Sequence, residues 1–254
     1  MRDLGINLVA SVLAAAAAWL IQRVFARRRL ARMRGFFGLR AGAPSLLIVG
    51  KHWSSPRVAS VHRNDVAALV ELGAIVKECG ARADVVPAAE APKELGKVTE
   101  FCVGSTESNS RTTAHLAALL PGVRVTTYDE GGDPVPFIVG GERFERQPHR
   151  EAYVLLARAV PTAHPLFLLV GQTSLSNLAA ARYLAGHHQE LRRSHGDRSP
   201  FCLVLRVRQP QAYGPDLVEL AADVTAAAFG DPPPAAPVPS PRRPWRLPVG
   251  RRRD

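Results

Sequence analysis

The chain has 254 residues, 46% of them hydrophobic, and a formal net charge of +11. Residues 41–230 contain 19 Lys or Arg and 19 Asp or Glu, so the excess charge lies in residues 22–40 and 231–254. A nucleic-acid-binding protein normally carries its basic patch on the folded domain, so this distribution argues against a DNA or RNA partner.

Residues 1–22 are predicted to form a transmembrane anchor. The stretch from Leu4 to Ile21 has no charged side chain. At about 1.5 Å per residue it makes a helix of roughly 27 Å, close to the ~30 Å hydrocarbon core of a bilayer. Trp19 lies where an interfacial aromatic anchor is expected. Asn7 weakens the apolar character of the span.

The basic segment 23–42 sets the expected topology. Seven arginines follow the apolar stretch and only Arg2 precedes it. The positive-inside rule therefore predicts a single-pass protein of the cell membrane, with its N-terminus outside and the C-terminal domain in the cytoplasm. Arginines near the leaflet also favour anionic lipids as a partner.

Two alternatives to the anchor stay open. The alanines from Ala14 to Ala18 permit cleavage as a signal peptide, although a signal peptide carries its positive charge before the apolar region. A soluble amphipathic helix is the other alternative.

Residues 43–230 are predicted to fold as one Rossmann-like α/β domain, with a mostly parallel sheet flanked by helices. Three apolar runs end in Val-Gly, at Gly50, Gly104 and Gly171. Each is followed by a polar loop and then by an apolar pattern of helical period. Continuous hydrophobicity is typical of strands that are covered on both faces.

The remaining elements follow from caps, turns and periodicity. Helices are predicted at 66–79, from 108 or 110 to 120, at 178–184 with a further turn over 187–194, and at 216–229. Further strands are predicted at 83–86, 123–127, 153–160 and 201–207, with a hairpin over 136–144. The sheet should therefore be mixed, with an antiparallel insertion near its middle. The cysteines, Cys79, Cys102 and Cys202, have no metal-like spacing and are interpreted as core residues in a reducing compartment.

Residues 231–254 contain eight prolines and six arginines. Such a segment buries too little apolar surface to offset its ordering entropy, so a disordered tail is predicted. Its Pro/Arg content makes it a candidate contact for a protein partner.

Two similar loops indicate a ligand site. Both run from Val-Gly through hydroxyl residues to Ser-Asn at the start of a predicted helix. Helix N-termini and nearby hydroxyls bind anions, so two such loops side by side predict a site for a phosphorylated ligand. Ordinary turn and cap chemistry is the alternative interpretation. The candidate ligand-binding residues are Gly104, Ser105, Thr106, Ser108, Asn109, Gly171, Thr173, Ser174, Ser176 and Asn177.

Asp129 is a further candidate, because it lies about 25 residues after Gly104, roughly where a ribose-binding carboxylate occurs in dinucleotide-binding folds. A solvated loop is the alternative. The sequence has neither a G-x-G-x-x-G motif nor a P-loop. His52 and His62 flank the first strand-to-helix loop together with Lys51, Arg57 and Arg63, and give it cations that the other two loops lack. No metal site and no catalytic residue are predicted.

Part of the chain resembles an uncharacterised group of bacterial Rossmann-like domains. The matching motifs are a strand, loop and helix with Gly104, Asn109 and Thr112, and a strand with Tyr153 and Arg158. A third element matches at Gly171 and at Ala180, Ala181, Arg182, Tyr183 and Leu184. The resemblance implies the fold and implies no catalytic residue.

The sequence therefore predicts a membrane-anchored cytoplasmic module that binds a nucleotide or another phosphorylated small molecule, with a sensor or regulatory role. The sequence identifies no cofactor, and a nucleotide is the one candidate. The alternative is a membrane-tethered hydrolase or transferase acting on a nucleotide-like substrate. Polar loops without a recognisable base or nucleophile favour the first. A structural or interaction module is a third reading.

Overall fold

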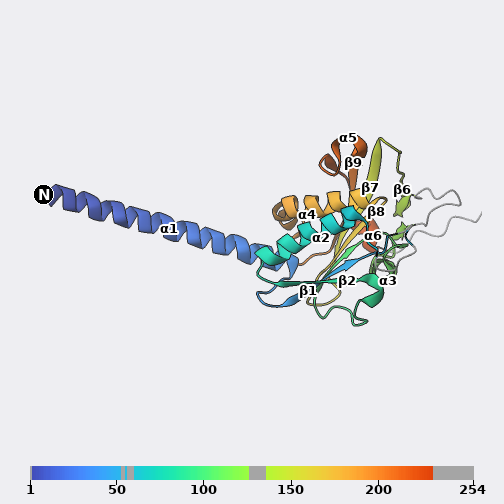
Figure 1. Cartoon of the computed structure of the whole chain (residues 1–254), viewed down its shortest axis with the longest axis horizontal. Helices are drawn as coiled ribbons and strands as arrows, with labels where there is room; N and C mark the ends of the chain where they lie inside the picture. The colour runs from blue at the N-terminus through green and yellow to red at the C-terminus, as the bar shows by residue number, and fades with distance from the viewer. Residues whose placement is uncertain (1, 53–54, 56–59, 126–135, 231–254) are drawn as a thin grey trace, which may run out of the picture.

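A computed structural model of the chain describes residues 2–52, 55, 60–125 and 136–230. Its centre is a seven-stranded sheet flanked by helices, from which the first helix projects (Figure 1). The helices are α1 (Arg2–Phe37), α2 (Arg63–Glu78), η1 (Ala88–Glu90), α3 (Ser110–Leu119), α4 (Ser174–His195), α5 (Pro210–Tyr213) and α6 (Thr225–Phe229). The strands are β1 (Pro44–Val49), β2 (Arg82–Pro87), β3 (Thr99–Val103), β4 (Val123–Val125), β5 (Phe137–Val139), β6 (Glu142–Phe144), β7 (Glu151–Ala159), β8 (Leu166–Gly171), β9 (Phe201–Arg208) and β10 (Val218–Asp223).

The central sheet has the order β10-β9-β7-β8-β3-β1-β2. Strands β2, β1, β3 and β8 are parallel neighbours, whereas β7 is antiparallel to both β8 and β9. Strand β9 therefore runs in the same direction as β8, and β10 pairs antiparallel at the far edge. The predicted mixed, mostly parallel sheet is confirmed. The hairpin predicted over 136–144 forms as β5 and β6, but it belongs to the separate sheet β4-β5-β6, and the antiparallel strands of the central sheet are β7 and β10.

The two faces of the sheet carry separate hydrophobic cores because successive strand residues point to opposite faces. Leu47 and Val49 face a core built with α1, α2 and α4. Ile48, which lies between them, faces a second core with α3, α6 and the small antiparallel sheet β4-β5-β6. This two-sided coverage explains the continuous apolar runs of the sequence.

The predicted transmembrane span is not supported. Within the described part of the chain, no helix combines the length and the hydropathy that crossing a membrane requires. Residues 2–22 are instead the first part of α1, which continues without a break through the arginines. Alanine is only weakly apolar, so the run from Ala14 to Ala18 adds length to the helix without adding much hydropathy.

The last turns of α1 belong to the folded domain. Met33, Phe36, Phe37 and Leu39 are buried in the first core, so the packed unit extends back beyond residue 43, where the domain was predicted to start. The Phe37 ring contacts Phe167 of β8, with 5.5 Å between the ring centroids.

Two predicted helices differ from the structure. Residues 216–229 form strand β10 and the short helix α6, because pairing with the edge of β9 outweighs the helical pattern of this segment. Residues 178–194 lie in one continuous helix, α4. The cysteines are buried and unpaired, as expected of core residues. The predicted tail, residues 231–254, lies outside the described residues.

Candidate functional site

A cavity lies at the carboxyl edge of the sheet, where β1, β3 and β8 end. Strand β3 lies between β1 and β8, so the loops that follow the three strands are neighbours. The volume of this cavity, which we call the loop cavity, is about 140 Å³. Its lining residues are Lys51, His52, His62, Asp65, Ser105, Ser108, Gly171, Gln172, Thr173, Ser174 and Asn177.

The loop after β3 contributes Ser105 and Ser108. Gly104 opens this loop with φ +119°, and a Cβ there would lie 2.7 Å from Ser108 Oγ. Ser108 Oγ donates to the Ser105 carbonyl at 3.2 Å. The Ser108 carbonyl accepts from the Lys51 backbone N–H at 2.9 Å, which ties this loop to the loop after β1.

Asn109 has a structural role behind the cavity. Its side chain is fully buried, and Oδ1 caps α3 by accepting from the N–H groups of Arg111 and Thr112. Its Nδ2 donates to the carbonyls of Val103 at 2.9 Å and Ile48 at 3.4 Å. The fold uses both polar atoms of the side chain, so here the cap interpretation is the better one.

The loop after β8 contributes Gly171, Thr173, Ser174 and Asn177. Thr173 is the N-cap of α4 and forms a capping box with Ser176, which is buried. Asn177 Oδ1 accepts from the Gly171 N–H at 2.7 Å. A Cβ at Gly171 would lie 2.5 Å from this oxygen, so any side chain there displaces Asn177.

Asp65, in the first turn of α2, places a buried carboxyl group in the loop cavity. It is 9% exposed, and its Oδ1 accepts from Asn177 Nδ2 at 2.8 Å. Burial raises the pKa of Asp65 to about 6, although the hydrogen bond from Asn177 and the charge of His52 oppose this shift. The group therefore exchanges its proton close to neutral pH.

Lys51, His52 and His62 supply the nitrogen groups of the cavity. The two imidazole rings stack with 5.3 Å between their centroids. His62 is the N-cap of α2, and its Nδ1 accepts from the Asn64 N–H at 3.1 Å. Burial lowers the pKa of His62, and the positive charges of His52 and Arg63 lower it further. The ammonium group of Lys51 is thus the cation best suited to meet an anion there.

The structure places six of the eleven predicted site residues in the lining of the loop cavity. Those in the cavity lining are Ser105, Ser108, Gly171, Thr173, Ser174 and Asn177. Gly104, Thr106, Asn109 and Ser176 are in the same two loops but not in the lining. Asp129 lies outside the described residues.

Asp65 and Gln172 were missed as site residues. In the sequence, Asp65 is indistinguishable from an ordinary helix-capping residue. Only its hydrogen bond with Asn177, which is distant in the chain, shows that it belongs to the site. Gln172 joins β7 and β6 to the cavity, because its Oε1 accepts from the Tyr153 N–H and its Nε2 donates to the Phe144 carbonyl. No local pattern marks either residue.

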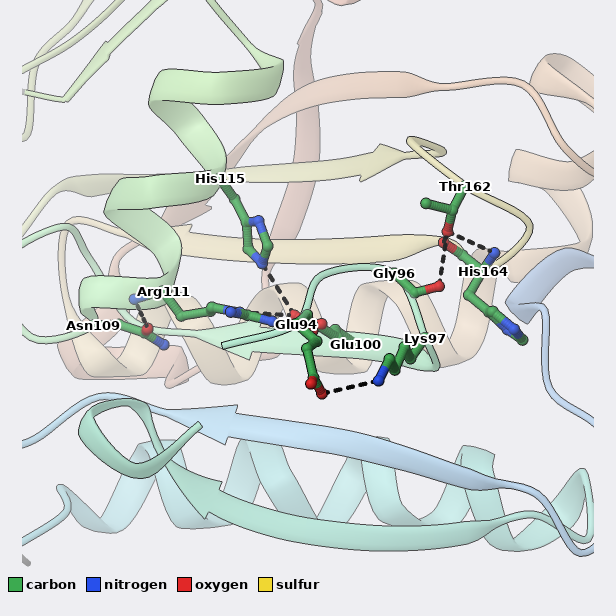
Figure 2. Close-up of polar contacts among 9 residues, drawn as sticks. All are labelled: Glu94, Gly96, Lys97, Glu100, Asn109, Arg111, His115, Thr162 and His164. Carbon is green, nitrogen blue, oxygen red and sulfur yellow. Dashed lines mark hydrogen bonds and ion pairs between the residues drawn. The ribbon is translucent and has the colours of Figure 1, made fainter. Parts of the chain in front are cut away.

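A second polar cluster, centred on Glu100, lies at the opposite end of β3 (Figure 2). Glu100 accepts from Arg111 at 2.8 and 3.1 Å and contacts His115 Nε2 at 3.0 Å. Burial raises the pKa of Glu100, but the hydrogen bonds from His115 and Arg111 outweigh it and hold the pKa below its ordinary value.

The Glu100 cluster is an ion-pair network and a poor metal site. Ligand atoms of Glu100, Cys102 and His115 lie within 4.8 Å of one another. The guanidinium of Arg111, however, engages both carboxylate oxygens of Glu100 and places a positive charge where a metal ion would sit. The cluster fixes α3 on β3.

Comparisons with protein-family models, curated proteins and solved structures found no match. The resemblance to the bacterial Rossmann-like group therefore stays a prediction.

Proposed function

We propose that the chain binds a phosphorylated small molecule, such as a nucleotide, in the loop cavity and acts as a sensor or regulatory module. The observation that carries the proposal is the convergence of three strand-to-helix loops on one cavity that contains Lys51. The N-termini of α2 and α4 meet there, and helix N-termini favour anions. The hydroxyls of Ser105, Ser108 and Ser174 line the same space.

The size of the cavity limits what it encloses. Sites that enclose a whole drug-sized ligand usually measure about 300–1,000 Å³, whereas the loop cavity measures about 140 Å³. We therefore assign it the phosphate part of the ligand.

Thermal denaturation of the full chain with a panel of phosphorylated ligands tests the proposal. We expect a nucleotide or sugar phosphate to raise the melting temperature. Lys51→Ala should weaken the binding of that ligand about tenfold or more, because it removes a charge-assisted contact. Lys97→Ala is the matched control, since Lys97 pairs with Glu94 at the exposed surface. Equal losses in the two variants, or no ligand effect in the wild type, would refute the proposal.

A hydrolase or transferase acting on such a ligand is the second candidate. It is favoured by the buried Asp65, whose pKa of about 6 suits proton transfer, in one cavity with His52 and His62. Product analysis by mass spectrometry tests it. Turnover that Asp65→Asn abolishes while leaving binding intact supports an enzyme, and binding without turnover supports the sensor.

We further propose that α1 carries the domain to an anionic membrane. The helix projects from the domain (Figure 1), and its side chains Trp19, Leu20 and Phe25 are each more than half exposed. The Arg23 guanidinium lies over the Trp19 ring at 4.9 Å, so cationic and apolar groups are combined as at a membrane interface. Cell fractionation of the full chain tests the association, and recovery of the protein only in the soluble fraction would refute it.

A further inference from the structure

A second cavity lies at the junction of α1 and α4, at the base of the projecting helix. Its volume is about 220 Å³. Two helix faces form it, because residues three or four positions apart lie on one side of a helix. We call it the arginine cavity, and its polar lining is Arg29, Arg32, His188, Gln189, Arg192 and Arg193.

The four guanidinium groups are poorly neutralised. Arg29 pairs with Glu78 at 3.6 Å and Arg192 with Asp197 at 3.5 Å, and both acidic side chains are half exposed. Arg32 and Arg193 have no ion-pair partner among the described residues, and no acidic side chain lines the cavity.

The helix dipole of α4 explains the arginines of α4 but not those of α1. Arg192 and Arg193 lie in the last turn of α4, where the helix dipole favours cations. It does not explain why α1 brings Arg29 and Arg32 against the same turn. The approach is fixed by packing, because Phe37 of α1 contacts the His188 ring with 5.7 Å between the centroids.

His188 lines the cavity and carries one buried ring nitrogen without a hydrogen-bond partner in the described part of the chain. The residue is 7% exposed, and its Nδ1 contacts the Ala185 carbonyl at 2.8 Å. Its Nε2 is buried and has no hydrogen-bond partner among the described residues.

We propose that the arginine cavity binds a phosphate group. Guanidinium groups match phosphate oxygens in pairs. Four of them converge here, and Arg32 and Arg193 have no ion-pair partner among the described residues. The phosphate has two sources, a soluble phosphorylated compound or a lipid headgroup. A groove beside the cavity shares Arg29, Arg32 and Gln189 with it, and its other lining residues are Phe25, Ala26, Leu30 and Glu78. The apolar side chains on α1 would let a lipid lie along the helix while its headgroup meets the arginines.

The proposal does not depend on ligand binding in the loop cavity. Substitutions in the two cavities distinguish binding at one site from binding at the other. Inorganic pyrophosphate is the soluble probe, and its effect on the melting temperature of the full chain is measured. Arg32→Gln with Arg193→Gln should weaken pyrophosphate binding at this site at least about tenfold, since two charge-assisted contacts are lost. Because pyrophosphate can also enter the loop cavity, the two substitutions are compared in the wild type and in Lys51→Ala, and the loss they cause should be the same in both backgrounds.

Vesicle flotation supplies the lipid arm. Full chain is mixed with phosphatidylcholine vesicles that contain or lack phosphatidylglycerol. The matched control is Arg27→Gln with Arg28→Gln, which removes the same charge from exposed positions of α1 outside the cavity. A specific site predicts that Arg32→Gln with Arg193→Gln loses more binding to the anionic vesicles than this control does.

The five outcomes are distinct. A selective loss in the soluble arm supports the site with a free phosphate compound as its ligand, and a selective loss in the vesicle arm supports it with a lipid headgroup. Equal losses in the Arg27/Arg28 control overturn the proposal in favour of unspecific electrostatics. Absence of binding in both arms overturns it as well. The ligand-free variant should melt no lower than the wild type, because mutual repulsion is relieved; a clearly lower melting temperature would assign the arginines to folding and also overturn it.

Discussion

The guanidinium of Arg158 lies over the ring of Phe36 at 4.5 Å and donates to its carbonyl at 3.2 Å. Arg158 is on β7 and is fully buried, whereas Phe36 is the penultimate residue of α1. The same guanidinium donates to the carbonyls of Gly196 and Ser199 after α4. One side chain thus joins the sheet, the first helix and the end of the fourth.

Arg158→Met keeps the apolar stem and leaves these carbonyls without a donor. We expect the free energy of unfolding to fall by about 3 kcal/mol. Guanidinium chloride denaturation measures the loss. Arg143→Met, which removes only an exposed pair with Glu145, should change the free energy by less than about 0.5 kcal/mol. A loss below about 1 kcal/mol in Arg158→Met would contradict this role.

Asp65 predicts a particular pH dependence of stability. Its pKa is about 6 in the folded protein and 3.8 without the fold, so the folded state holds the proton more tightly. The contribution of Asp65 to stability is therefore fully present below about pH 4 and is lost as the pH rises through 6, a change of up to about 3 kcal/mol. Asp65→Asn should remove this component, because the amide oxygen still accepts from Asn177 but carries no charge. Denaturation of both proteins at pH 4, 5, 6 and 7 gives the difference, and a pH-independent difference would contradict the assignment.

The contribution of Glu100 to stability is predicted to have the opposite pH dependence. Its pKa is lowered in the folded state from 4.5, so its contribution is present above pH 4.5 and is lost as the pH falls through the lowered value. Glu100→Gln leaves Arg111 buried without its counter-charge and should cost about 3–5 kcal/mol at neutral pH. Glu145→Gln, at an exposed pair, is the control. A small loss at neutral pH that does not shrink in acid would show that the pair is not stabilising.

The two kinds of loop residue should respond differently to substitution. Asn109→Ala removes a buried cap and is expected to lower the free energy of unfolding by about 2 kcal/mol. Ser105→Leu narrows the loop cavity at a half-buried position and should abolish ligand-induced stabilisation with little cost to the fold. Thermal denaturation with and without ligand measures both effects. The assignment fails if Ser105→Leu retains the ligand effect in full.

The strands and loops of the site could be predicted because their signals are local. Runs that end at Gly50, Gly104 and Gly171 mark buried strands, and their hydroxyl-rich loops mark helix starts. The order of the strands depends on long-range contacts, which local patterns do not reveal. The sequence therefore could not predict that Asp65 contacts Asn177 or that Lys51 lies in the same cavity.

The errors have physical causes of the same kind. Arg32, Arg34 and Arg40 dominate the segment in which Met33, Phe36 and Phe37 are core residues, so their burial is concealed by charge. The segment 216–229 has a helix-compatible pattern, and its pairing with β9 depends on an edge that no local signal reveals.

The way α1 ends has a mechanical consequence. The Phe37 ring contacts Phe101 of β3 and Phe167 of β8, and the carboxyl ends of these two strands border the loop cavity. Because α1 is unbroken from Arg2 to Phe37, a torque applied to its projecting end reaches the strands without passing through a flexible joint. The contacts of Phe37 anchor the helix on β3 and β8. A tilt of the helix and a ligand in the loop cavity therefore act on the same pair of strands.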